Sequence, residues 1–314
     1  MQQLLPKWMS AVISGDRLAL GRAITAIEDN TPDALLISKA IYGRTGRGNI
    51  IGVTGPPGAG KSTLISAITR ELRQNGRSVA IVAIDPSSPF SGGAILGDRL
   101  RMVEHAMDEG VFIRSLATRG HLGGLSQATL RTTDLLDAAG FDSIIVETVG
   151  AGQTEIDIAG IARVVLLVVA PGLGDDIQAI KAGILEIADF IVVNKADAPG
   201  SERTYSQLRS ALSLVPQGST VQVFGTVASS GKGVPELLNA VAARFARLEP
   251  GSDSRTAWKR IRKLLSGVAA RRVSEGIEHV HHPALDQLCN AVLTGELDLT
   301  TAAERAISIV LDER

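Results

Sequence analysis

Seven short runs of apolar, mostly β-branched residues cross the middle of the chain, and they restrict its fold more than any other feature. They are separated by stretches with helical spacing and lie at 50–55, 79–85, 111–117, 143–149, 164–170, 190–194 and 221–227. The runs are apolar throughout instead of alternating with polar residues, which is typical of parallel strands buried on both faces by helices. The sequence therefore predicts a doubly wound α/β domain with a mostly parallel sheet, spanning residues 49–250.

Helical periodicity marks both ends of the chain. Apolar residues recur at helical spacing before a glycine-rich stretch, which predicts an N-terminal helical segment over 1–48. Residues 251–314 are expected to form a C-terminal helical arm, with a long amphipathic helix over 257–280 and a last helix that opens with a capping box of Thr301 and Glu304. An amphipathic helix outside the core needs a partner for its apolar side, and self-association would supply one.

Composition narrows the class of protein. The 314 residues are 45% hydrophobic and 21% charged, as in an ordinary soluble globular protein. Lys and Arg number 32 against 33 Asp and Glu, so net charge indicates neither a nucleic acid nor a membrane surface as a partner. The single cysteine, Cys289, excludes an internal disulfide and suits a reducing compartment. No signal-peptide pattern and no apolar run near the ~20 residues of a membrane span is present, so the expected location is the cytoplasm.

A phosphate-binding loop directly follows the first apolar run. The stretch from Gly55 to Ser62 fits G-x-x-x-x-G-K-[ST] between a predicted strand and a predicted helix, the context that a P-loop NTPase requires. Backbone N–H groups and the helix N-terminus would surround the phosphates. Lys61 would neutralise the β- and γ-phosphates, and the Ser62 hydroxyl would ligate magnesium. The predicted phosphate-loop residues are Gly55, Pro56, Pro57, Gly58, Ala59, Gly60, Lys61, Ser62 and Thr63.

The tetrapeptide NKAD follows the sixth apolar run and indicates that the base is guanine. In the N-K-x-D motif of GTPases, Asp197 would accept hydrogen bonds from the ring imino N–H and the exocyclic amine, and Asn194 would brace the loop. The stem of Lys195 would cover the base. Adenine presents the opposite arrangement of donors and acceptors. The loop 226–233 fits the place where a backbone N–H, that of Ala228, meets the guanine carbonyl oxygen, and its alternative is a plain glycine-rich turn.

Carboxylates near the ends of predicted strands are candidates for a magnesium site. Glu147 stands where many GTPases have the aspartate of D-x-x-G, and the N–H of Gly150 would sense the γ-phosphate. Asp85 and Asp98 bracket a segment expected to wrap the nucleotide, and their oxygens suit Mg²⁺. Alternatively, Asp85 only caps a turn and Asp98 only starts a helix. The predicted catalytic residues are Lys61, Asp85, Asp98, Glu147 and Gly150, and the predicted metal ligands are Ser62, Asp85, Asp98 and Glu147.

Nearly the whole chain resembles the MeaB group of GTPases, also labelled ArgK and similar to the human protein of methylmalonic aciduria type A. The shared stretches are GPPGAGKST, DPSSPFSGGAILGDRLRM, TRGHLGGLS, ETVGAGQTE, GDDIQAIKAGILEIADFIVVNKAD and GELDLTTAAERA. The group consists of chaperones of adenosylcobalamin-dependent acyl-CoA mutases. The resemblance implies a G domain of the SIMIBI class, GTP and Mg²⁺ as ligands, and a homodimer held by the C-terminal helices. It also implies that GTP hydrolysis gates loading of adenosylcobalamin and protects or reactivates the mutase.

The resemblance further implies a switch loop and a set of partners. The stretch 171–184 would be an extra switch loop in which Asp175, Gln178 and Lys181 respond to the partner and the nucleotide, and its alternative is a helix N-terminus with an acidic cap. The partner would be methylmalonyl-CoA mutase or a mutase for 2-hydroxyisobutyryl-CoA or isobutyryl-CoA, with an adenosyltransferase as a further candidate. The chain has Asp176-Ile177 where the family commonly has Glu-Leu, which leaves the choice of mutase open.

The sequence assigns no residue that orients the attacking water, because Gln153 does not directly follow the glycine of the motif. A site without such a residue is expected to hydrolyse GTP slowly unless a partner orders it. Three arginines, Arg114, Arg119 and Arg131, are candidates for stabilising charge on the phosphates, and solvated or structural roles are their alternatives.

Other functions are compatible with parts of the sequence. A metallochaperone GTPase would need soft ligands, and the chain offers Cys289 and the cluster His279, His281 and His282, which could instead cap helix carbonyls or face solvent. An ATP-dependent kinase linked to amino-acid transport conflicts with the guanine motif. A dimer that only binds nucleotide fits poorly with a magnesium-binding serine and several nearby acids.

Overall fold

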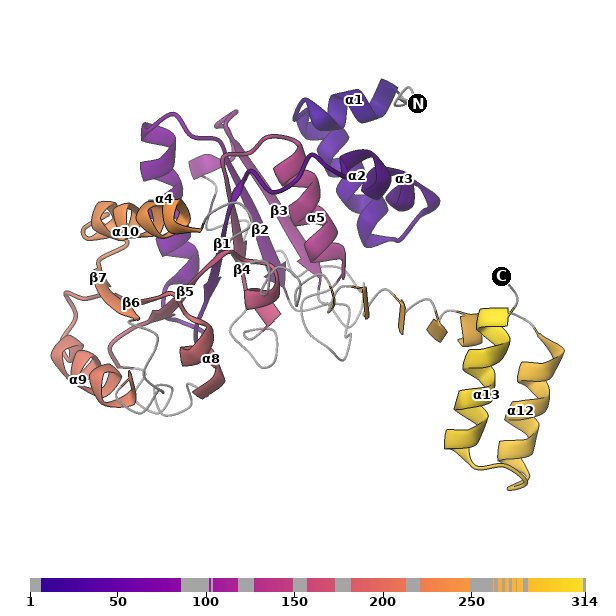
Figure 1. Cartoon of the computed structure of the whole chain (residues 1–314). Helices are drawn as coiled ribbons and strands as arrows, with labels where there is room; N and C mark the ends of the chain where they lie inside the picture. Colours follow the sequence, from indigo (N-terminus) through magenta and orange to yellow (C-terminus); the bar gives the residue numbers. More distant parts are fainter. Residues whose placement is uncertain are drawn as a thin grey trace. The chain divides into compact units, whose positions relative to one another are not determined.

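The chain forms two compact units, 1–252 and 253–314, called the larger and the smaller unit below. The computed structural model in Figure 1 describes residues 7–85, 102, 104–117, 127–148, 157–172, 182–212, 221–248 and 282–312, with separate residues between 262 and 278. The N-terminal helices belong to the larger unit, together with the sheet.

The larger unit is built on a seven-stranded sheet with the order β3-β2-β4-β1-β5-β6-β7, in which every neighbouring pair is parallel. The strands are β1 (Asn49–Thr54), β2 (Val79–Asp85), β3 (Val111–Ala117), β4 (Ser143–Glu147), β5 (Val164–Val169), β6 (Phe190–Asn194) and β7 (Gln222–Thr226). Each of the seven apolar runs contains one strand. The prediction of a doubly wound, mostly parallel α/β domain is confirmed.

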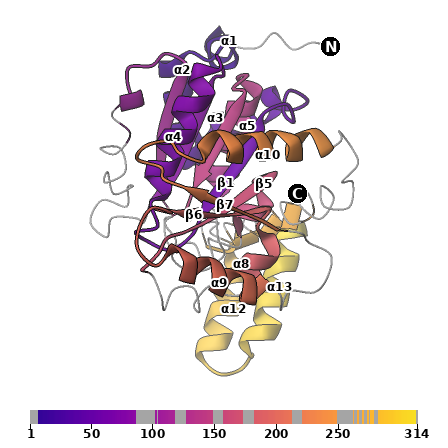
Figure 2. The ribbon, with the colours of Figure 1, turned by 90° about the vertical axis from the view of Figure 1, so that its left-hand side faces the viewer.

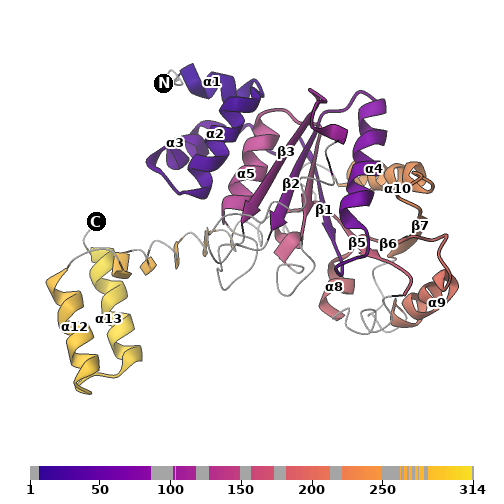
Figure 3. The same ribbon diagram turned by 180° about the vertical axis from the view of Figure 1, so that it is seen from behind.

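Helices cover both faces of the sheet. One face carries α4 (Lys61–Gln74) and α10 (Val234–Arg247), and Figure 2 views the sheet from their side. The other face carries α5 (Gln127–Ala138), as Figures 1 and 3 show. It also carries α8 (Ala182–Ile187) and α9 (Ser201–Leu212), whose buried residues form a second cluster with β5 and β6. A parallel crossover usually contains such a helix, because consecutive parallel strands begin at the same edge of the sheet. A short 3₁₀ turn, η2 (Ile158–Gly160), precedes β5.

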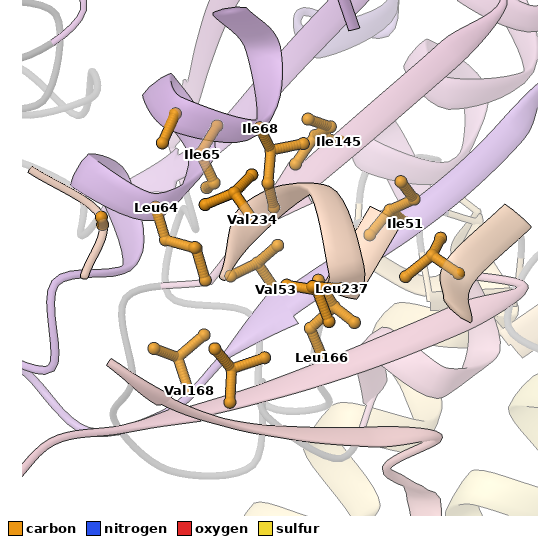
Figure 4. Close-up of a cluster of buried hydrophobic side chains, with 14 of the residues drawn as sticks. Ile51, Val53, Leu64, Ile65, Ile68, Ile145, Leu166, Val168, Val234 and Leu237 are labelled. Atoms are coloured by element: carbon orange, nitrogen blue, oxygen red, sulfur yellow. The ribbon is translucent and has the colours of Figure 1, made fainter. Parts of the chain in front are cut away.

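The largest hydrophobic core lies between the sheet and the helices α4 and α10 (Figure 4). Residues of α4 at helical spacing meet alternate residues of the central strands, and every second strand residue points to this face. The residues labelled in Figure 4 are Ile51, Val53, Leu64, Ile65, Ile68, Ile145, Leu166, Val168, Val234 and Leu237, all fully or almost fully buried. Burying each such side chain stabilises the fold by about 1.5–3 kcal/mol. The core therefore holds α4, and with it the preceding loop, firmly against β1.

Three N-terminal helices, α1 (Lys7–Ile13), α2 (Arg17–Glu28) and α3 (Pro32–Ile41), pack beside α5 and β3. Polar contacts join them to the sheet. Arg114 of β3 forms an ion pair with Glu28 and donates a hydrogen bond to Thr25 Oγ1 at 3.0 Å. Arg131 of α5 donates to Asn30 Oδ1 at 3.4 Å. Both arginines thus have structural roles, as the alternative interpretation proposed, whereas Arg119 lies outside the described residues.

The smaller unit contains α12 (Pro283–Leu293) and α13 (Leu299–Asp312), which pack against each other. The described residues between 262 and 278 are helical, within the stretch predicted to form a long helix. Cys289 is exposed on α12. Throughout the described ranges, no helix combines the length and the apolar character needed to cross a bilayer.

The helix caps of the smaller unit differ from those predicted. The first residue before α13 is Asp298, whose carboxylate accepts hydrogen bonds from the N–H of Thr301 at 3.0 Å and from its hydroxyl at 2.6 Å. Asp298 is therefore the cap, and Thr301 lies in the first turn of the helix. His282 accepts the N–H of Ala284 through Nδ1 at 3.2 Å, so it caps the start of α12 instead of carbonyls at a helix end. His279 and His281 lie outside the described residues.

Candidate nucleotide-binding site

The loop between β1 and α4 contains two glycines at which a side chain would clash with neighbouring strands. Gly55 has φ of 139°, and a Cβ there would lie 2.0 Å from the carbonyl oxygen of Val168. Gly60 has φ of 88°, and its Cβ would lie 2.4 Å from Nδ2 of Asn194. No described side chain caps the start of α4, so the N–H groups of its first turn point into the loop. Such an arrangement at the carboxyl edge of a parallel sheet is suited to binding an anion.

Lys61 lies folded back across the loop in this structure. Its side chain is 7% exposed, and Nζ donates hydrogen bonds to the carbonyl oxygens of Gly55 at 2.8 Å and Pro56 at 3.1 Å. A buried ammonium group needs such acceptors. Phosphate oxygens are stronger acceptors than carbonyls because they carry charge, so a bound polyphosphate would compete for this ammonium group.

Two carboxylates reach the same edge of the sheet as the loop. Glu147 ends β4 and Asp85 ends β2, the neighbouring strand, and both are buried. The hydroxyl of Ser62 donates to Glu147 Oε1 at 2.7 Å, which joins the first turn of α4 to β4. The structure thus brings together three of the four predicted metal ligands at one edge, and Asp98 lies outside the described residues. Gly150 also lies outside the described residues.

The donors present fit magnesium. A serine hydroxyl and carboxylate oxygens are the hard ligands that Mg²⁺ prefers. Within the described residues, no three His, Cys, Asp or Glu side chains gather into a cluster that would enclose an ion on their own. A magnesium ion here would complete its coordination with water and nucleotide phosphate, as Mg²⁺ commonly does.

Asn194 connects the loop after β6 to the phosphate loop. It is 2% exposed, and its Nδ2 donates to the carbonyl oxygens of Ala59 at 3.0 Å and Gly60 at 3.4 Å. Its Oδ1 accepts from the hydroxyl of Thr226 at 3.2 Å and from the N–H of Ala228 at 3.1 Å. One amide side chain therefore holds three loops in a fixed relation, which agrees with the bracing role predicted for it.

The neighbouring residues of the guanine motif surround this asparagine. Lys195 has φ of 54°, and its Nζ donates to the carbonyl oxygen of Gly58 at 2.9 Å, so its stem extends over the loop. Asp197 is exposed at the start of the following turn, where a ligand can reach it. The N–H of Ala228 already donates to Oδ1 of Asn194. Its hydrogen bond to a guanine carbonyl stays a prediction, and this N–H would then have to be shared between Asn194 and the base.

The structure leaves the predicted switch loop outside its described residues and adds a pair of threonines to the site. The proposed switch residues Asp175, Gln178 and Lys181 lie outside the described residues. Conversely, the sequence interpretation missed Thr54 and Thr148, whose hydroxyls meet at 2.9 Å in the core of the site. The only sequence signal for this contact is that a threonine is the second-last residue of an apolar run in both places.

Comparisons with known proteins show the family to which the chain belongs. The sequence pattern of the family described as "Methylmalonyl Co-A mutase-associated GTPase MeaB" matches residues 20–279. A protein of Pyrococcus horikoshii named as a GTPase is 44% identical over 309 residues, which cover 95% of each chain. The mitochondrial homolog of the methylmalonic aciduria type A protein from Mus musculus is 34% identical over 256 residues, covering 75% of this chain and 62% of that one.

Among solved structures, one described as "LAO/AO transport system kinase" has a TM-score of 0.68 and 25% sequence identity. The alignment covers 98% of this chain and 100% of that chain. The likeness therefore includes nearly the full length of both proteins.

Proposed function

Because this chain belongs to the MeaB family of methylmalonyl-CoA mutase-associated GTPases, we propose that it hydrolyses GTP with Mg²⁺ in the service of an adenosylcobalamin-dependent acyl-CoA mutase. The observation that carries the GTPase part is the network of Asn194, which ties the guanine-motif loop to the phosphate loop. A nucleotide bound across the two loops would present its base to Asp197 and its phosphates to Lys61. The mutase part rests on the family relationship.

The residues at the sheet edge support hydrolysis mainly by positioning. The N–H groups of the loop and the ammonium group of Lys61 would bind the phosphates. Ser62 and Glu147 would bind the magnesium ion. A bound Mg²⁺ would neutralise charge on the β- and γ-phosphate oxygens. Asp85, buried at the end of β2, would order water around the ion. Asp98 and Gly150 keep the roles predicted for them, near the metal and the γ-phosphate.

A slow intrinsic rate is part of the proposal. Arg114 and Arg131 are engaged with the N-terminal helices, so they do not serve as arginine fingers in this arrangement. A GTPase site without an arginine finger or a water-orienting glutamine typically turns over slowly, and ordering by a partner can raise the rate by orders of magnitude. The mutase would supply that ordering through the loop of Asp175, Gln178 and Lys181, which couples GTP hydrolysis to loading of adenosylcobalamin.

The proposed assembly is a homodimer in the cytoplasm, with the smaller unit as the contact. Large apolar side chains on α13 are exposed, with Leu299 at 73%, Ile307 at 40% and Leu311 at 60%. Their spacing of eight and four residues places them on one side of the helix. A second copy would cover this side, and an adenosyltransferase remains a further candidate partner. Sedimentation of the purified protein should give twice the chain mass.

The test is GTP turnover by the purified protein alone and with acyl-CoA mutases acting on methylmalonyl-CoA, isobutyryl-CoA and 2-hydroxyisobutyryl-CoA, with and without adenosylcobalamin. The proposal predicts slow Mg²⁺-dependent turnover alone and a rate at least tenfold higher with one of the mutases. Lys61→Ala should remove turnover in both conditions. Tight GTP binding with a flat rate across the panel would refute the mutase partner and leave the GTPase. Preference for ATP would refute the GTPase and favour a kinase.

A further inference from the structure

Two buried threonines link the phosphate loop to the end of β4. Thr54 is the last residue of β1 and leads directly into Gly55, and Thr148 is the first residue after β4. Both are 0% exposed. The hydroxyl of Thr148 donates to Oγ1 of Thr54 at 2.9 Å, and its backbone N–H donates to the carbonyl oxygen of Val53 at 3.1 Å. The second bond extends the β1–β4 ladder by one residue beyond the paired strands.

The consecutive residues Glu147 and Thr148 hold opposite ends of the phosphate loop. Glu147 accepts a hydrogen bond from Ser62, at the point where the loop enters α4. Thr148 contacts Thr54, at the point where the loop leaves β1. The end of β4 therefore contacts both the first and the last part of the phosphate loop. Any shift of Thr148 moves the adjacent Glu147 carboxylate relative to Ser62, the other proposed magnesium ligand.

We propose that Thr54 and Thr148 form a positioning pair for GTP hydrolysis, which fixes the Glu147 carboxylate against Ser62. The inference rests on the proposed GTPase function and adds two residues that do not touch the nucleotide. Positioning of reacting groups is sensitive, since a misplacement of about 1 Å can reduce a rate by roughly a hundredfold.

The alternative is that the pair only stabilises the core. Elsewhere in the described part of this protein a buried threonine hydroxyl has no partner: Thr132 Oγ1 on α5 is buried and neither accepts nor donates a hydrogen bond. Buried hydroxyls are therefore not restricted to sites where they bond. Thr132→Val is the control for the substitution itself, since it removes one buried hydroxyl that makes no hydrogen bond and lies away from the phosphate loop.

The experiment compares Thr148→Val, Thr148→Ser and Thr132→Val in the full chain. For each, turnover of GTP is measured against Mg²⁺ concentration, GDP affinity is measured in EDTA, and the folded fraction is measured by denaturant unfolding. We expect Thr148→Val to lower kcat roughly tenfold and to raise the Mg²⁺ concentration for half-maximal rate. GDP affinity in EDTA should stay within about twofold, because the Asn194 network is untouched. Thr148→Ser should restore the rate, since it retains the hydroxyl.

A double-mutant cycle with Thr54→Val separates a pair from two independent contacts. If the hydroxyls act through each other, the double variant should be no slower than Thr148→Val alone. The proposal is overturned if Thr148→Val turns over GTP like Thr132→Val, if Thr148→Ser fails to restore the rate, or if the two valine effects simply add. A wild-type protein that binds GTP but never hydrolyses it would instead refute the proposed function, and this inference with it.

Discussion

Replacing Gly60 by alanine should destabilise the phosphate loop more than the same replacement at Gly58. Both glycines have positive φ, 88° and 78°. Alanine in this left-handed region costs about 1–2 kcal/mol at either position. The surroundings differ, because a Cβ on Gly58 meets nothing within 4 Å, whereas one on Gly60 lies 2.4 Å from Nδ2 of Asn194.

The difference between the two variants measures the bracing by Asn194. To restore ordinary contact, the amide of Asn194 would have to move by about 1 Å, which would break or weaken its bonds to Ala59 and Gly60. Each net hydrogen bond contributes about 0.5–1.5 kcal/mol. Gly60→Ala should therefore lose about 1–3 kcal/mol more than Gly58→Ala. At tenfold per ~1.4 kcal/mol, this is roughly a 5- to 150-fold lower ratio of folded to unfolded protein.

The assay is urea unfolding of the nucleotide-free variants, together with GDP affinity measured by displacement of a fluorescent analogue. Gly58→Ala provides the matched control because its carbonyl can still accept from Lys195. Equal losses of unfolding free energy in the two variants would show that Asn194 does not hold the loop. A loss confined to GDP affinity at Gly60, with no loss of stability, would refute the reasoning as well, since it would place the effect on the ligand.

Two further predictions concern stability away from the loop. Arg114→Met should lower the free energy of unfolding by about 2 kcal/mol, because it removes the Arg114 cation from the Glu28 carboxylate, which is 13% exposed. Arg70→Met should cost under about 1 kcal/mol, because both side chains of the Arg70–Glu104 pair are 46% exposed. Urea unfolding distinguishes the two variants, and equal losses would contradict this account. The hydrogen bond from the backbone of Ser78, and then that from its hydroxyl, lower the pKa of Asp142. Its stabilising effect is present above the unfolded pKa of about 3.9 and is lost as pH falls through the lower folded pKa, so the stability difference between wild type and Asp142→Asn should shrink below about pH 4. A difference that stays constant from pH 6 to 3 would rule this out.

Local patterns were sufficient to predict the sheet and the loops at its edge. Each apolar run became a strand because buried parallel strands need apolar side chains on both faces. The bracing by Asn194 could be anticipated because the N-K-x-D motif and the phosphate loop each carry their own sequence signature, and carboxyl ends of parallel strands meet at one edge.

Contacts that depend on the order of strands could not be predicted from the sequence. Thr54 and Thr148 meet only because β4 lies beside β1, although 94 positions separate them in the sequence. The carboxylate of Asp137 accepts N–H groups from the linker at Gly46, Arg47 and Gly48, and nothing in the local sequence of α5 indicates that partner.

Errors at helix ends had a different cause. Asp298 and Thr301 are both good capping residues three positions apart, and the sequence pattern alone fits a helix start at either. The structure begins α13 at Leu299, so the aspartate takes the cap and the threonine hydroxyl donates to it. The histidine cluster before Pro283 suggests capping of helix carbonyls or exposure to solvent, and His282 instead caps the start of α12, where proline favours the first turn.

The most direct test of the central claim compares the affinities of the wild-type protein and Asp197→Asn for GTP, ATP and xanthosine triphosphate. Xanthine carries a carbonyl where guanine has its exocyclic amine, so it needs a donor where guanine needs the Asp197 acceptor, and an asparagine amide supplies one. The account predicts that the wild type binds GTP at least a hundredfold more tightly than ATP or xanthosine triphosphate, and that Asp197→Asn prefers xanthosine triphosphate. Equal affinity of the wild type for ATP and GTP, or an unchanged preference in the variant, would contradict it.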